Sequence, residues 1–65
     1  MPFTINTHDA WGTVQVGSFQ TLEEAREVFS SLCRDPWYRL DGGIKALELV
    51  AHNHGETERL EWFAF

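Results

Sequence analysis

The stretch TLEEAREVFSSLCRDP (residues 21–36) carries the clearest structural signal in this chain of 65 residues. Thr21 and Glu24 have the spacing of a capping box, in which each side chain accepts a hydrogen bond from the other residue's free main-chain amide. Pro36 disfavours helical backbone at the residue before it. The stretch therefore predicts a helix from about 22 to 34. Apolar side chains at helical spacing form its inner face: Leu22, Ala25, Phe29, Leu32 and Cys33.

Alternating apolar and polar residues precede this helix. Phe3 and Ile5 alternate with polar neighbours over residues 2–8, and Val14 and Val16 do the same over residues 13–19. The stretch between them contains turn-forming residues. We therefore expect a β-hairpin that turns Phe3, Ile5, Val14 and Val16 towards the helix.

After the helix, residues 36–43 are expected to form a loop that ends in a glycine pair. Residues 44–52 are interpreted as a strand with Leu47, Leu49 and Ala51 on one face, although their helix-forming composition leaves a short helix open as an alternative. Residues 57–65 alternate again. In that strand we expect Leu60, Trp62 and Ala64 to face the helix, and Phe63 and Phe65 to face the other way.

These elements predict one α+β domain over residues 1–65 with the order ββαββ and one helix packed on one face of a four-stranded sheet. A helical crossover naturally places the first and last strands side by side and parallel. The expected strand order is therefore 2-1-4-3 in a mixed sheet. This topology resembles the β-grasp arrangement of the immunoglobulin-binding protein G domain, and a likeness of topology carries no function with it.

The amino-acid composition limits the kinds of molecule that the chain is expected to bind. Ten acidic and five basic residues give a formal net charge of −5, which disfavours direct binding to nucleic acid or to anionic membranes and favours basic protein surfaces. Cys33 is the single cysteine, so no internal disulfide can form. The N-terminal residues lack the basic and apolar regions of a signal peptide. We expect a cytoplasmic protein.

Residues capable of catalysis or metal binding are sparse. His52 and His54 are two positions apart, and His8 and Glu56 are the available further ligands, but the turn at Asn53–Gly55 would separate the pair. Cys33 lies on the predicted buried stripe, where a thiol packs as a small apolar group. We therefore expect no enzyme activity, no catalytic residues, no metal site and no cofactor.

The placement of aromatic residues suggests an interface. The second predicted hairpin is apolar on both faces, whereas one helix covers one face, so an exposed apolar patch is expected. The expected partner-binding residues are these: Ile44, Val50, Phe63 and Phe65 on the open face, Trp11, Trp37 and Tyr38 in loops, and Glu23 and Glu27 on the acidic helix surface.

The sequence therefore predicts a non-catalytic protein-binding module. Its most concrete form is a small acidic inhibitor from a phage or mobile element, similar in kind to anti-CRISPR proteins, that occupies a basic surface of a host protein. A structural homodimer that packs through Phe63 and Phe65 is one alternative. A small-ligand or metal-binding protein is the other.

Overall fold

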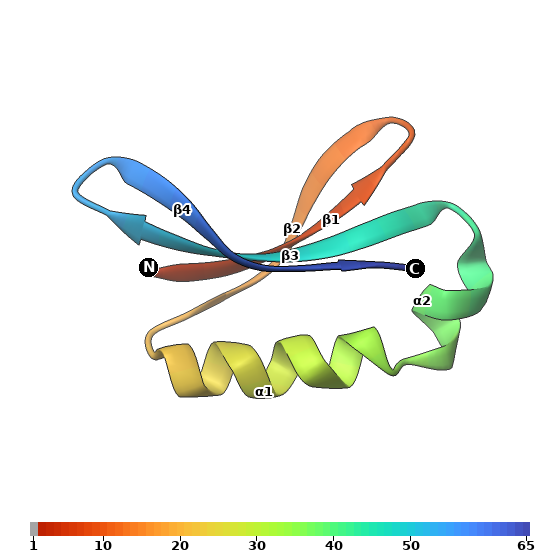
Figure 1. Cartoon of the computed structure of the whole chain (residues 1–65), viewed down its shortest axis with the longest axis horizontal. Helices are drawn as coiled ribbons and strands as arrows, with labels where there is room; N and C mark the ends of the chain where they lie inside the picture. Colours follow the sequence, from red (N-terminus) through yellow and green to blue (C-terminus); the bar gives the residue numbers. More distant parts are fainter. Residues whose placement is uncertain (1) are drawn as a thin grey trace.

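The computed structural model describes residues 2–65, which form four strands and two helices (Figure 1). The elements in chain order are β1 (Phe3–Asp9), β2 (Gly12–Phe19), α1 (Leu22–Cys33), α2 (Pro36–Asp41), β3 (Ile44–Asn53) and β4 (Glu56–Ala64). α1 lies along one face of the sheet, and α2 follows it at the end where β3 begins. The α+β class is confirmed. Neither helix within residues 2–65 has both the length and the apolar character that crossing a lipid bilayer requires.

The sheet has the strand order β2-β1-β3-β4, and every neighbouring pair is antiparallel. The predicted mixed sheet of order 2-1-4-3 is therefore wrong, and the β-grasp order does not apply. β3 contains five consecutive buried residues, Ala46–Val50, and a strand buried on both faces belongs in the interior of a sheet. β4 carries the charged residues Glu56, Glu58, Arg59 and Glu61, which suit an edge.

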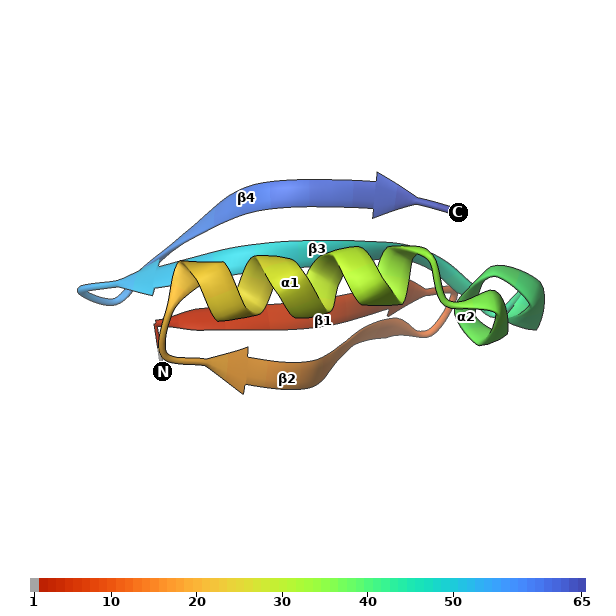
Figure 2. The ribbon, with the colours of Figure 1, turned by 90° about the horizontal axis from the view of Figure 1, so that it is seen from below.

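The connection from β2 to β3 positions α1. Both strands run antiparallel to β1, so they point the same way with β1 between them. α1 carries the chain across this interval and lies over β1 and β3, while β2 and β4 form the two margins (Figure 2). Phe19 at the end of β2 packs against the core, but the Gly12–Val16 part of the strand lies outside the cover of α1. Val14 is on the α1 side of the sheet, since its register partner Thr7 pairs with the buried Leu47, yet Val14 and Val16 are exposed and not buried under the helix as predicted.

α1 begins as the sequence predicts. The Thr21 side chain accepts a 3.2 Å hydrogen bond from the Glu24 amide, and the helix ends at Cys33, within one residue of the expected boundary. The region predicted as a loop contains α2 instead. Asp35 caps this short helix through a 2.9 Å bond from the Trp37 amide, and Pro36 occupies the first turn, where its missing N–H costs nothing.

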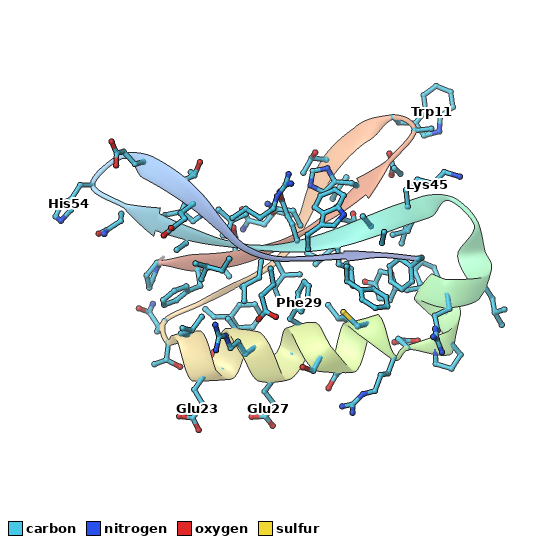
Figure 3. The ribbon with its side chains drawn as sticks, in the orientation of Figure 1. Trp11, Glu23, Glu27, Phe29, Lys45 and His54 are labelled. Atoms are coloured by element: carbon cyan, nitrogen blue, oxygen red, sulfur yellow. The ribbon has the colours of Figure 1, made fainter. Side chains whose placement is uncertain are left out.

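The core lies between α1 and the two central strands. Ala25 and Phe29 of α1 pack against Ile5, Leu47 and Leu49, all of them buried. Figure 3 shows the Phe29 side chain pointing from α1 towards the sheet. The inward placement of Ile5, Leu47 and Leu49 is confirmed, and the strand interpretation of residues 44–52 holds over Ile44–Asn53, against the helical alternative.

β4 departs from the predicted alternation because it contains a bulge. Leu49 pairs with Glu61 and the next residue, Val50, pairs with Arg59, so Leu60 is an extra residue on β4. Leu60 and Phe63 both pack against the core even though they are three positions apart. The inward prediction for Trp62 and the outward prediction for Phe63 are therefore wrong. Leu60 faces the core as predicted, but after the bulge each side chain points to the face opposite to the predicted one.

Candidate protein-binding face

The sheet face opposite α1 carries a connected group of polar and aromatic side chains, which we call the open face. Within residues 2–65 no helix covers it (Figure 1). Asn6 pairs with Glu48 in the β1–β3 ladder, and Glu48 pairs with Trp62 in the β3–β4 ladder. Directly opposed residues project to the same face, so these three side chains meet there. The residues of the open face are Thr4, Asn6, His8, Thr13, Glu48, Val50, His52, Arg59 and Trp62.

Glu48 is the centre of this group and is only 7% exposed. Its Oε1 accepts a 3.0 Å hydrogen bond from Asn6 Nδ2, and its Oε2 accepts a 2.9 Å bond from Arg59 Nε. His8 Nε2 lies 2.9 Å from Oε1, an ion-pair distance, although the ring is not aligned for a good hydrogen bond. Burial alone would raise the pKa of Glu48. The contacts from Asn6, His8 and Arg59 outweigh burial and lower that pKa below its ordinary value.

Trp62 lies beside this carboxylate on β4 and is 45% exposed. The guanidinium carbon of Arg59 lies 4.2 Å from the centroid of the Trp62 ring, which is cation–π distance. The His8 ring is 4.8 Å away between centroids and is tilted by 58°. The indole is thus held by a cation and a second ring while much of its surface faces solvent.

Two hydroxyl groups extend the network. Thr13 Oγ1 lies 3.2 Å from His8 Nδ1, so the imidazole is contacted at both nitrogens, by β2 on one side and by Glu48 on the other. Thr4 Oγ1 lies 2.8 Å from His52 Nε2. A surface depression runs beside these groups, and its lining residues are Asn6, Glu48, Val50, His52, Thr57 and Arg59. All four strands contribute to the open face.

A second aromatic group lies on the α1 side of the sheet, next to α2. Tyr38 stacks on Phe65 at 6.4 Å between centroids, and Phe65 meets Phe63 edge to face at 5.2 Å. Trp37 contacts Tyr38 edge to face at 5.1 Å. This chain of rings leads from the core to the surface. Phe63 and Phe65 therefore do not form the open-face patch that the sequence predicts.

The predicted partner-binding residues are spread over separate surfaces. Val50 belongs to the open face but is nearly buried, and Ile44 is half-buried at the beginning of β3. Trp11 projects from the tip of the β1–β2 hairpin, 96% exposed. Glu23 and Glu27 point from α1 away from the sheet (Figure 3). One flat partner surface could not contact Trp11 and the two glutamates together.

Val50 is the one open-face residue that the sequence predicted as a contact. The missed residues include the four that form the centre of the network: His8, Glu48, Arg59 and Trp62. A signal for Glu48 exists in the sequence. It is a charged residue inside the otherwise apolar run Ala46–Val50, and a buried carboxylate requires partners. Trp62 has no comparable signal, because its outward direction depends on the bulge in β4.

The groups considered for metal binding and nucleophilic catalysis lie apart from one another. Among residues 2–65 no three His, Cys, Asp or Glu side chains gather in a way that could hold a metal ion. His54 sits in the β3–β4 turn with a φ of 50°, while His52 contacts Thr4. Cys33 is half-buried. Burial and the nearby Glu61 carboxylate raise the pKa of its thiol, against a smaller lowering by Arg34.

Comparison of the chain with protein-family models, with curated proteins and with solved structures found no significant match.

Proposed function

We propose that this protein is a non-catalytic protein-binding module that docks through the open face, with Trp62 and Arg59 as the central contacts. The observation that carries the proposal is the state of Trp62: it is nearly half exposed on an uncovered sheet face, yet Arg59 and His8 fix its ring. Tryptophan and arginine are the residue types most enriched among the energetically dominant contacts of protein interfaces.

The surrounding network supports this role because it holds the two anchors before any partner arrives. Glu48 fixes Arg59 through Nε, and Asn6 and His8 fix Glu48. Side chains already held in one conformation lose less entropy on binding than mobile ones. The Nη atoms of Arg59 would donate to carbonyl or carboxylate groups of the partner, while the exposed indole would cover an apolar group beside them.

The test compares three forms of the chain in affinity capture from the native host, with bound proteins identified by mass spectrometry. Trp62→Ala should lose the proteins that the wild type retains. Trp11→Ala is the matched control, because it removes the same side chain from the hairpin tip, where the ring is 96% exposed. Both variants are first checked for folding by circular dichroism. Equal capture by Trp62→Ala and the wild type would contradict the proposal.

The more specific role expected from the sequence, a phage or mobile-element inhibitor that covers a basic host surface, is a second candidate. It is favoured by Glu23 and Glu27, which are exposed on α1 and point away from the sheet. Under this candidate, the double substitution Glu23→Lys with Glu27→Lys should abolish capture at low salt while Trp62→Ala has no effect. The two candidates therefore use opposite faces and predict opposite results from the same pair of variants.

A further inference from the structure

The two edges of the sheet differ in their protection against pairing with another strand. β4 carries four charged residues along one margin: Glu56, Glu58, Arg59 and Glu61. β2 forms the other margin and contains neither a charged residue nor a proline in Gly12–Phe19. Charged side chains and proline are the usual protection of an edge strand. β2 is therefore the less protected edge.

β2 also exposes apolar side chains. All positions from Gly12 to Val16 are exposed, with Val14 at 56% and Val16 at 42%. β2 contains a bulge at Val16, where the register passes from Gly17 to Gln15. The bulge gives this edge partial protection against pairing, because it interrupts the regular strand. The bulge leaves Gly12–Gln15 as a regular segment, long enough for a short antiparallel pairing.

The main-chain groups available for pairing follow from one hydrogen bond. Thr7 Oγ1 of β1 donates to the Val14 carbonyl oxygen at 3.4 Å, so that carbonyl is directed towards β1. Adjacent residues of a strand direct their main-chain groups to opposite sides. Thr13 and Gln15 therefore direct their N–H and C=O groups outward from the edge.

The distribution of charge indicates which molecule can pair with β2. Asp9 is the only one of the fifteen Asp, Glu, Lys and Arg residues that lies within residues 1–20. A chain of net charge −5 repels its own copy wherever the acidic residues approach each other, and the β2 margin is where two copies can meet without that approach. α1 is set back over β1 and β3 and leaves this margin open (Figure 2).

We infer that a second copy of this chain pairs with β2 in antiparallel register, about a two-fold axis at Val14, to give a continuous eight-stranded sheet. Thr13 of one copy then exchanges main-chain hydrogen bonds with Gln15 of the other. The two Val14 residues form the non-hydrogen-bonded pair, in which opposing side chains lie closest. Thr13 is the open-face residue that takes part, and it pairs through its main chain. The Trp62 and Arg59 side chains lie on β4, at the opposite margin, so the pairing is independent of the proposed function.

Sedimentation equilibrium over a range of protein concentrations tests this arrangement. The wild type should approach twice the monomer mass as concentration rises, and Val14→Lys should remain a monomer at every concentration. Thr57→Lys is the matched control, because it places the same charge at an exposed position on the opposite edge strand. It should dimerise like the wild type. A wild type that stays monomeric at millimolar concentration would overturn the inference, and so would a dimer that survives Val14→Lys.

Amide hydrogen exchange locates the pairing. On dimerisation the amides of Thr13 and Gln15 should become protected at least tenfold, while the Val14 amide, already directed to β1, should change little. Protection that appears on β4 instead would contradict the assignment. Trp62→Ala should leave this pattern intact, which separates the dimer from the docking function. The wild type could also stay monomeric while an unrelated peptide protects Thr13 and Gln15. That result would show that the edge pairs with another protein and not with a second copy of this chain.

Discussion

Arg59 and Glu48 are joined by a 2.9 Å hydrogen bond from Nε to Oε2, although the two residues are not register partners. Arg59 is paired with Val50, and Glu48 is paired with Trp62. The contact is therefore diagonal across β3 and β4, and it draws the guanidinium over the indole at 4.2 Å. The buried carboxylate thus helps to hold the cation over the exposed tryptophan, whose direction follows from the bulge in β4.

Replacing Glu48 with glutamine should destabilise the fold by about 1–3 kcal/mol. The carboxylate accepts hydrogen bonds at both oxygens, from Asn6 and from Arg59. An amide of the same shape must direct its own NH₂ group at one of these donors, which leaves a nearly buried polar group unsatisfied. Urea denaturation measures the difference. Glu58→Gln is the matched control at an exposed position of β4 and should change the stability by less than about 0.5 kcal/mol.

The same carboxylate predicts a dependence of stability on pH. The pKa of Glu48 is lowered in the folded state from its ordinary value of 4.5. The unfolded chain therefore binds a proton at higher pH than the folded chain does. The stabilising contribution is complete above pH 4.5 and is lost as the pH falls through the lower folded-state pKa. Melting temperatures measured from pH 6 to pH 3 should fall more steeply for the wild type than for Glu48→Gln. Parallel curves would show that Glu48 is not the group responsible.

Phe63 should act as a core residue and not as a contact for a partner. Its side chain packs against the buried cluster and meets Phe65 edge to face. Phe63→Ala should lower the free energy of unfolding by about 2–4 kcal/mol, since it removes a large partly buried ring. Trp37→Ala removes a mostly exposed ring from α2 and should cost less than about 1 kcal/mol. Equal losses from the two substitutions in chemical denaturation would contradict this placement.

The local elements of this fold other than α2 are predictable from sequence, because their signals act over a few residues. The capping pair Thr21 and Glu24 and the stop at Pro36 fix α1 to within one residue, and alternation finds all four strands. The order of the strands depends on which strands can lie at an edge of the sheet without exposing a large apolar surface. The charges of β4 and the largely apolar run Ala46–Val50 of β3 carry that information, and both favour β3 as the interior strand.

The open face is less predictable, since it depends on irregularities that a period of two cannot represent. The extra residue Leu60 reverses the direction of every later side chain in β4, which exchanges the places of Trp62 and Phe63. Similarly, Val14 and Val16 fit an inward pattern, but α1 does not extend over the Gly12–Val16 part of β2 (Figure 2). Alternation predicts which residues of a strand share a face. It does not predict which part of that face a helix covers.

The cap of α2 yields a last prediction, at the segment predicted as a loop. The Asp35 side chain accepts the Trp37 amide at 2.9 Å, and Gly42 ends the helix with a φ of 74°. Asp35→Ala should destabilise the protein by about 1 kcal/mol through loss of the cap, whereas Asp35→Asn retains an acceptor and should cost a few tenths. Because Tyr38 of α2 stacks on Phe65, the loss of the cap should also change the near-ultraviolet circular dichroism of the aromatic side chains. An alanine variant with unchanged stability and an unchanged aromatic spectrum would show that α2 does not depend on Asp35.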